Sequence, residues 1–507
     1  MGNVLVKEET LTEIAESIRE KTGFSDKYRP AEMPEAIRGI STSADDGPSE
    51  EDSIRFYGYE GKLLYSYSIE EMKALTELPR LPEVEGLICQ GWNWSLENLQ
   101  SLNREMDVGA IFITDDGATR IYVSLNEDTV HPFMGIYQRV ANCMKIDWGD
   151  GSQLESSEVI NERVWFEHQY ETPGDYVIRL IPEEGADVSI YGGIGGTNLF
   201  QKNTDEDRTN IAYSNTIEKI EIGKGITYFG EYALMGRNLK HVTIPDEKIS
   251  LKSVFEGAKS LRHITIPNTV ITIWSDFCNG CTCLEKVCFP EGLKNIYSDV
   301  FRDCLSLKTL CLPETLSGLG STWFIGCDSL RSVCFPENLK TIPTSVLSGC
   351  DRLEKVRMGA NTTKISSQAF YNCKCLKELQ ISEGVTTLGY SFLYGNEFLR
   401  RVELPDSLLS IDSTAFQYCY GLIEMTIPKN VTSIATGAFN GCSGIDNYYF
   451  YPSIPPTLGA NTVFNGISEN CKIHVPKGCL EAYQAADIWS EFVDYMVEME
   501  DEDEETE

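Results

Sequence analysis

The chain has 507 residues, more than one compact domain usually holds, so we expect several domains or a long repeat array. A hydrophobic fraction of 42% is enough for a core, and a formal net charge of -34 makes the molecule a strong anion. Such a charge repels phosphates and anionic bilayers, so we expect no nucleic-acid partner. The sequence has no apolar run of about 18 residues, so we expect no membrane insertion.

Residues 1–40 predict a pair of short helices, with Leu11, Ile14 and Ile18 on one face of the first. A segment this short cannot hold a core, which favours a helical anchor or oligomerisation module. "LTEIAESIREKTG" and "PAEMPEAIRGI" are similar to an N-terminal module of phage and prophage tail and other structural proteins, and a generic amphipathic hairpin is the alternative. The resemblance implies contact with other virion proteins, with a homo-oligomer as a further possibility. Residues 41–52 predict a polar linker.

Residues 53–107 alternate apolar and polar side chains around "YEGK", which predicts a small β-rich module. The segment resembles a β-rich module found in phage-encoded and gut bacterial proteins. Trp92 and Trp94 are candidates for stacking on sugar rings, but packing in a core or hairpin is the more common role of such aromatic residues.

Residues 108–192 contain "MKIDWGDGSQ" and "WFEHQYETPGDYVIRLI", which together resemble a PKD-like β-sandwich, a family that spaces domains and supports adhesion. Trp148 directly precedes Gly-Asp-Gly, a departure from the family pattern W-x-F-G-D-G. Asp147 and Asp150 are weak calcium candidates, and an Asp-Gly turn is the favoured alternative. The motif residues are Asp147, Trp148, Gly149, Asp150, Gly151, His168, Tyr170, Gly174 and Tyr176. A connector over 193–216 follows.

Residues 217–470 repeat with a period of 23, and such a period with a recurring leucine predicts a solenoid. Each unit begins with a short strand, which a proline usually ends, and continues through a second apolar pair to a turn with an inward Phe or Leu. The spaced leucines are Leu261, Leu284, Leu307, Leu330, Leu353, Leu376, Leu399 and Leu422, with Leu239 before them.

The pattern L-x-x-[IV]-x-[IF]-P-x-x-[VL]-x-x-[IL]-x-x-x-[AV]-F-x-x-C resembles the BspA-type leucine-rich repeat of bacterial surface proteins and some phage and protist proteins. Gly359 and Ser382 replace the proline in two units. Residues 471–496 resemble the strand-plus-helix cap of such arrays, and 497–507 form an acidic tail, for which a solvated end is favoured over a docking peptide. The predicted fold is mainly β and multi-domain: a leucine-rich-repeat solenoid of 23-residue repeats preceded by β-sandwich-like modules and a short N-terminal helical hairpin.

One repeat position holds a cysteine in seven units and Asn396 in another, which favours a structural role in a tight inward corner. This predicted cysteine ladder comprises Cys281, Cys304, Cys327, Cys350, Cys373, Cys419 and Cys442. The run Cys278, Cys281 and Cys283 suggests zinc, but no second pair lies at ligand spacing, so we expect no metal. No nucleophile–base motif or phosphate-binding glycine loop is present, and we expect no cofactor and no enzymatic activity.

If the strand leucines face inward, positions 2, 3 and 5 of each unit face outward and form a basic stripe. This stripe is a candidate binding site for an anionic polymer, and the alternative is pairing with Glu285, Glu354, Glu378 or Glu403 on the same face. Cys288, Cys311 and Cys334 occupy position 5, where we expect partly exposed, oxidation-prone thiols. The stripe residues are Lys240, His241, Arg262, His263, Lys286, Lys308, Arg331, Lys355, Arg357, Lys377, Arg400 and Arg401.

The sequence favours a non-enzymatic adhesion protein, a phage or prophage virion component (tail or head fibre-like) that binds host cell-surface polysaccharide or protein through the solenoid. Because the N-terminus lacks the basic start and apolar run of a secretory signal, we expect synthesis in the cytosol without a signal peptide and a final place at the virion surface. The alternatives are a bacterial interaction scaffold or cell-surface protein and, more weakly, a structural virion spacer.

Overall fold

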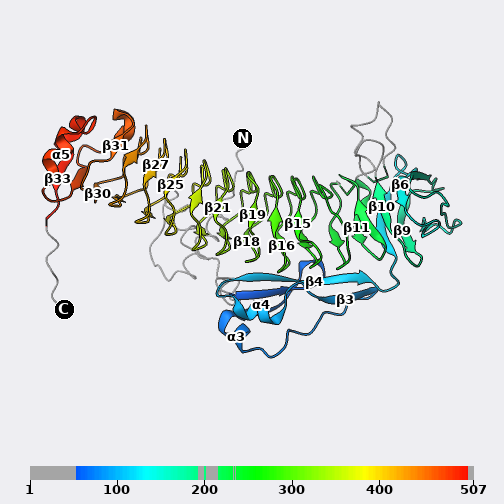
Figure 1. Cartoon of the computed structure of the whole chain (residues 1–507). Coiled ribbons are helices and arrows are strands. Elements are labelled where there is room, and N and C mark those ends of the chain that lie inside the picture. The colour runs from blue at the N-terminus through cyan, green and yellow to red at the C-terminus, as the bar shows by residue number, and fades with distance from the viewer. Residues whose placement is uncertain (1–52, 192–198, 201–214, 232, 235, 501–507) are drawn as a thin grey trace, which may run out of the picture. The chain divides into compact units, whose positions relative to one another are not determined.

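The 23-residue period becomes a coil of parallel strands in the computed structural model (Figure 1). The structure describes residues 53–191, 199–200, 215–231, 233–234 and 236–500. The predicted helical pair, the linker, most of the connector and the end of the acidic tail lie outside the described residues. Residues 54–507 belong to one compact unit.

Each solenoid turn places one three- or four-residue strand in a first strip of parallel strands. Partners are 23 residues apart, as where Thr309 pairs with Ser332 and Ser332 with Lys355, so every repeat position forms a column along the coil. The strands of this first strip are β13 (His241–Thr243), β14 (His263–Thr265), β16 (Lys286–Cys288), β18 (Thr309–Cys311), β20 (Ser332–Cys334), β22 (Lys355–Arg357), β24 (Glu378–Gln380), β26 (Arg401–Glu403), β28 (Glu424–Ile427), β30 (Asn447–Phe450) and β32 (Lys472–Val475).

A second strip of two-residue strands follows the bend that comes after each first strand. Ile411 pairs with Ile434 in register there, and their side chains are buried. The strands of this second strip are β15 (Thr272–Ile273), β17 (Asn295–Ile296), β19 (Gly318–Leu319), β21 (Thr341–Ile342), β23 (Lys364–Ile365), β25 (Thr387–Leu388), β27 (Ser410–Ile411), β29 (Ser433–Ile434) and β31 (Thr457–Leu458).

Stacking supplies the core that a single turn lacks. The repeat leucines are buried along the coil, and the inward aromatic side chains form a column in which Phe416 and Phe439 stack with ring centroids 5.2 Å apart. Burying one such side chain contributes about 1.5–3 kcal/mol, so stability grows with each added turn. Backbone bonds close the third side, as where Phe370 N–H donates to the Phe392 carbonyl.

A two-sheet sandwich precedes the coil and is continuous with it. β11 (Ile217–Glu221) pairs antiparallel with β5 (Thr119–Leu125) and parallel with β13, so the sandwich covers the first solenoid turn. The Trp148 ring is buried in the sandwich core and stacks on His168. The Tyr170 hydroxyl donates a 2.7 Å hydrogen bond to the Trp148 backbone carbonyl. The remaining strands are β6 (Phe133–Gln138), β7 (Met144–Asp147), β8 (Arg163–Glu167), β9 (Gly174–Pro182), β10 (Val188–Tyr191) and β12 (Ile226–Phe229). The sandwich is observed, and its kinship with PKD domains stays a prediction.

A separate four-stranded sheet of order β2-β1-β4-β3 forms the first β module, drawn in blue in Figure 1. Its last strand, β4 (Met106–Thr114), crosses the predicted boundary between 107 and 108, which moves the end of this module to residue 114. Ser68 and Glu71 form a capping box at the start of α3 (Ile69–Ala74). The other elements are β1 (Ser53–Tyr57), η1 (Tyr59–Gly61), β2 (Leu63–Ser68), β3 (Leu87–Trp92) and α4 (Leu96–Ser101).

The C-terminal cap closes the other end of the solenoid core. The Tyr483 hydroxyl and Trp489 indole N–H, both buried, donate to the carbonyls of Pro452 and Pro456 at 2.7 Å. The cap elements are η3 (Asn461–Phe464), α5 (Leu480–Ala485), η4 (Trp489–Tyr495) and β33 (Met496–Glu498), which pairs with β32. Among the described residues, no helix combines the length and apolar character needed to cross a bilayer.

Candidate recognition face

The outer surface of the first strip, called here the strand face, is divided into a covered and a free part. Residues 54–114, called the docked module, lie against it, and β4 contacts β13, β14 and β16 (Figure 1). Alternate side chains of β4, including Met106 and Val108, fill the module's own core, while Asp107 and Gly109 meet the solenoid. This alternation leaves β4 buried on both faces.

A buried ion network joins the module to β16. The Asp107 carboxylate receives 2.7 Å and 2.9 Å bonds from Arg55 and from Lys286 of the solenoid. Burial alone raises the pKa of Asp107, but Lys286 and Arg55 outweigh burial and hold the pKa below its ordinary value. Lys286 also donates to the Thr309 hydroxyl and lies over the Tyr57 ring. With its charges paired and hydrogen-bonded, the network fixes the position of the module on the solenoid.

The loop after β3 anchors the module at the ends of the strands. The Asn93 amide donates 3.2 Å bonds to the carbonyls of Ile266 and Cys288, and the Trp94 indole donates a 2.8 Å bond to the Phe289 carbonyl. Both side chains are buried, so the solenoid carbonyls take the place of water as acceptors for their N–H groups.

Arg104 is the anchor farthest along the coil. Its buried guanidinium reaches Cys334 of β20, donates to the Leu312 carbonyl and lies 2.7 Å from the Glu314 carboxylate. The covered part of the strand face therefore extends from β13 to β20.

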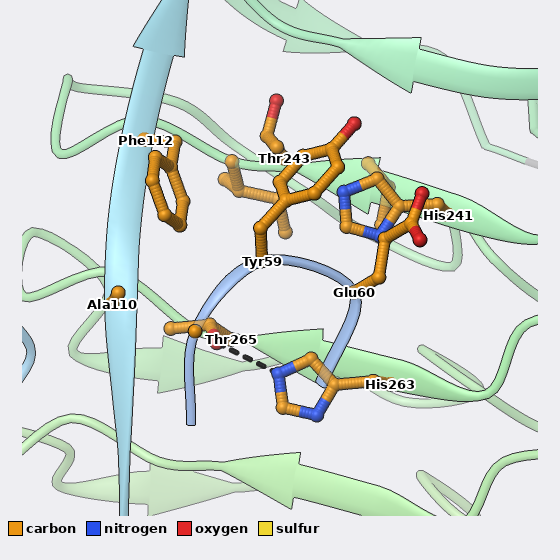
Figure 2. A pocket seen from close by; sticks show the side chains of 11 residues that line it. Tyr59, Glu60, Ala110, Phe112, His241, Thr243, His263 and Thr265 are labelled. Atoms are coloured by element: carbon orange, nitrogen blue, oxygen red, sulfur yellow. Dashed lines mark hydrogen bonds between the residues drawn. The ribbon is translucent and has the colours of Figure 1, made fainter. Parts of the chain in front are cut away.

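Two histidines lie beneath the module, in the region that Figure 2 shows. His241 and His263 are only 7% and 6% exposed, and they line a cavity of about 20 Å³ with Tyr59 of η1 and Thr243. Burial is the main cause that lowers their pKa values, to about 4 for His241 and about 3 for His263. Both rings are therefore neutral in the docked state at physiological pH.

These histidines and the position-5 thiols correct two predictions. Three members of the predicted stripe, His241, His263 and Lys286, lie under the module and do not face solvent. The thiols predicted to be partly exposed are 0%, 2% and 6% exposed for Cys288, Cys311 and Cys334. In both cases the module covers repeat positions that do point outward from the coil.

The free part of the strand face, from β22 onward with its border at Lys308 and Arg331, carries seven of the nine remaining stripe residues. Two stripe residues next to the sandwich, Lys240 and Arg262, pair with Glu218 and Glu285. The other seven are exposed or half-buried and are called the basic patch: Lys308, Arg331, Lys355, Arg357, Lys377, Arg400 and Arg401.

Most of the basic patch lacks an ionic partner. Arg357 pairs with Glu337 at 3.1 Å and Arg401 with Glu403 at 2.9 Å. In the part of the chain that the structure describes, no ion pair is formed by the other five patch residues, nor by Glu354 or Glu378 of the same face. Over the five turns from Leu307 to Leu404, outward positions hold seven cations and three carboxylates, an excess of positive charge on an acidic protein.

The predicted cysteine ladder is buried and forms one repeated hydrogen bond. Cys350 Sγ lies 3.2 Å from the Phe324 carbonyl, and Cys442 Sγ 3.0 Å from the Phe416 carbonyl, in each case 26 residues earlier. Asn396 takes the same place, and its amide donates to the Phe370 carbonyl at 2.8 Å. A small side chain that can donate a hydrogen bond satisfies this corner, which explains why asparagine can replace cysteine there.

The calcium and zinc candidates have ordinary structural roles. Asp147 and Asp150 each accept a backbone N–H two residues ahead, and Asp150 also lies 2.7 Å from His168. Cys278 and Cys281 are buried in the solenoid core. Across the residues that the structure describes, no cluster of three or more His, Cys, Asp or Glu is suited to hold a metal ion.

The tryptophan candidates for sugar stacking are also internal. The Trp92 indole donates to the Pro79 carbonyl, Trp94 donates into the solenoid, and both rings are buried. Sequence reasoning missed the docked module, although the repeats contain a sign of it. Position 5 holds Thr or Cys in every turn under the module, and Arg357, Gln380 and Glu403 in the three free turns that follow, before Thr426.

A model of the "BspA type Leucine rich repeat region" matches the chain in six copies, over residues 200–253, 247–377 and 348–468. No curated protein matches the chain. Similar solved structures include a leucine-rich repeat protein from Bacteroides ovatus, with 23% identity and a TM-score of 0.42 over 63% of this chain and 97% of that one.

Two further solved structures are similar to the chain at 16% identity. The pneumococcal vaccine antigen PcpA has a TM-score of 0.39 over 63% of this chain and 96% of its own, and a leucine rich cell surface protein from Faecalibacterium prausnitzii has 0.34 over 58% and 92%. The family assignment rests on the repeat model, which covers just over half of the 507 residues. The chain belongs to the BspA-type leucine-rich repeat family.

Proposed function

We propose that the chain is a non-enzymatic recognition protein that binds an anionic surface polymer, such as an acidic polysaccharide or a teichoic acid, through the free strand face. The observation that carries the proposal is the basic patch: five exposed cations without an ion pair among the described residues, on adjacent turns of a protein with a net charge of -34. Parallel strands lie about 4.8 Å apart, so the patch presents a row of cations to a repeating anion.

The finer proposal is that the chain works as a phage or prophage virion component that contacts the host surface. A bacterial cell-surface protein or interaction scaffold is the alternative and would use the same face. Detection of the chain in purified particles supports the virion proposal, whereas detection in the cell envelope of a strain that makes no particles supports the alternative.

Binding is tested with the full chain and two probes, wall teichoic acid and heparin. The variant Lys355→Glu/Lys377→Glu/Arg400→Glu reverses three charges of the basic patch. The control Lys294→Glu/Lys340→Glu/Lys364→Glu reverses three exposed charges on the side of the second strip. We expect saturable binding that weakens with salt and at least about tenfold in the patch variant alone. Equal binding by both variants, or none by the native chain, would contradict a role for the patch.

A further inference from the structure

The contact between the docked module and the solenoid has an unusual composition for a permanent interface. Near its centre lie an ion network of Arg55, Glu105, Asp107 and Lys286, two histidines and three thiols. The module's apolar cluster reaches the solenoid at Cys311, so these polar groups lie beside apolar contacts. Obligate interfaces are more hydrophobic and resemble a divided core. The composition is suited to a contact whose strength depends on protonation.

The two histidines carry polar atoms without partners at this interface. Among the described residues, His241 Nε2, Thr243 Oγ1 and His263 Nδ1 are buried and have no hydrogen-bond partner, and all three residues line the cavity in Figure 2. The other ring nitrogen of His263 is 3.1 Å from the Thr265 hydroxyl. A protonated ring has N–H donors at both nitrogens, so protonation would add a donor where no acceptor lies.

The charged groups around the histidines do not favour imidazolium overall. Lys219 lowers the pKa of His241 while Glu221 opposes it, but the Glu221 carboxylate is already bonded to Lys219 and to the hydroxyls of Tyr59 and Tyr122. His241 and Lys286 both lower the pKa of His263, and Asp107, which opposes them, is held by Lys286 and Arg55.

The remaining titratable neighbours do not change this balance. Tyr57, whose ring lies 6.0 Å from that of His263, has a pKa raised mainly by burial and is neutral, as is Tyr59. Glu60 also lines the cavity. The buried carboxylates nearest the histidines, Glu221 and Asp107, are thus engaged elsewhere, and Glu60 is exposed to solvent. A proton taken up by either ring would therefore be poorly compensated.

We propose that the contact between residues 54–114 and the solenoid is an acid-sensitive clasp, which opens when His241 and His263 are protonated and uncovers the strand face from β13 to β20. The inference does not depend on which ligand the free face binds. Opening would expose Lys286 and the three position-5 thiols and would extend the free face toward the sandwich.

The direction of the pH effect follows from the lowered pKa values. A histidine released from the interface has a pKa near 6.5, whereas docked His241 and His263 have values of about 4 and 3. Docking is therefore strongest above pH 6.5 and weakens as pH falls below it. Below pH 6.5, each histidine lowers the equilibrium constant for docking about tenfold per pH unit. For the two histidines together, acidification from pH 6.5 to pH 4.5 lowers this constant by a factor on the order of 10⁴. Asp107 remains ionised across this range.

Thiol labelling of the full chain tests the clasp. The probe is 2,2′-dithiodipyridine, which reacts with thiols in acid as well as at neutral pH, and peptide mapping assigns each labelled cysteine. Between about pH 7.5 and pH 4.5 we expect labelling of Cys288, Cys311 and Cys334 to rise at least about 100-fold. Cys350 and Cys419, in the solenoid core, should remain unlabelled because the coil stays folded.

Two variants make the test specific. Gly109→Ala gives the labelling rate of the open state at each pH, because a β-carbon there would lie 2.3 Å from Thr265 Oγ1 and 2.9 Å from Cys288 Cβ. His241→Phe/His263→Gln removes both titrating groups and should stay closed at pH 4.5. If this double variant is already open at pH 7.5, the single variant His241→Phe serves in its place. Between pH 7.5 and pH 4.5, the logarithm of its thiol-labelling rate should rise by about half as much as in the native chain.

Three results would overturn the clasp. First, the three thiols could stay protected at pH 4.5 in the native chain. Second, they could become reactive with the same pH dependence in the histidine variants, which would assign the trigger to another group, such as Glu105, whose pKa burial raises. Labelling of Cys350 and Cys419 together with the interface thiols would show general unfolding in place of a local opening.

Discussion

The covered and free parts of the strand face have the same backbone and the same repeat positions but different side chains. Under the module, positions 3 and 5 hold uncharged side chains, as in His263 with Thr265 and Ser332 with Cys334. The exception is Lys286, whose charge is paired with Asp107 of the module. On the free part, the same positions hold long charged side chains, as in Lys355 with Arg357. In a solenoid, then, the side chains at inward positions indicate the fold, and those at outward positions indicate whether a turn is covered or exposed to solvent.

The largest expected effect comes from breaking the buried ion network. Asp107→Leu leaves Arg55 and Lys286 buried without their shared carboxylate, which should cost about 3–5 kcal/mol of docking free energy. Urea unfolding together with labelling of Cys311 measures this loss. Adding Lys286→Met should recover part of it, since an apolar pair replaces the ion pair. A loss below about 1 kcal/mol would show that the network does not hold the module.

A smaller effect is expected at the tryptophan anchor. Trp94→Phe keeps most of the ring packing but removes the indole donor, and the buried Phe289 carbonyl loses its bond at a cost of about 1–3 kcal/mol. The readout is labelling of Cys288 beneath the module. Trp92→Phe is the matched control, because its indole bonds to Pro79 within the module. Equal exposure of Cys288 in both variants would contradict an anchoring role for Trp94.

The cysteine ladder lies in the core of covered and free turns alike, so its contribution to stability should not depend on the docked module. Asn396→Cys restores the residue of the other units and should change the free energy of unfolding by less than about 1 kcal/mol. Asn396→Leu removes the donor from two buried carbonyls, those of Phe370 and Leu393, and should cost about 1–3 kcal/mol or more. Urea denaturation compares the two variants, and equal stability would contradict a hydrogen-bonding role for this position.

The smallest effect is expected at a free-face position. Glu378 occupies the repeat position of Lys286 and is exposed, without an ion pair in the described part of the chain. Glu378→Leu should therefore change the free energy of unfolding by less than about 0.5 kcal/mol. Thermal or urea unfolding measures it, and a loss comparable with that of Asp107→Leu would remove the distinction between the two parts.

The sequence predicts the solenoid well because the inward lattice repeats every 23 residues and can be read locally. The same holds for the cysteine ladder, whose burial follows from its place beside the repeat leucines. The docked module could not be predicted in this way, since it depends on single pairs far apart in the chain, such as Asp107 with Lys286 and Asn93 with Cys288. Without that contact, His263 and Lys286 looked like parts of one basic surface.

The most direct test of the division is the reactivity of one repeat position in its two settings. At neutral pH, Cys334 lies beneath Arg104, whereas Arg357→Cys places a thiol at the same position of the next turn on the free part. We expect the introduced thiol to be labelled at least about 100-fold faster than Cys334, and we expect Gly109→Ala to remove most of this difference. Equal labelling of the two thiols in the otherwise native chain would show that residues 54–114 do not cover the strand face.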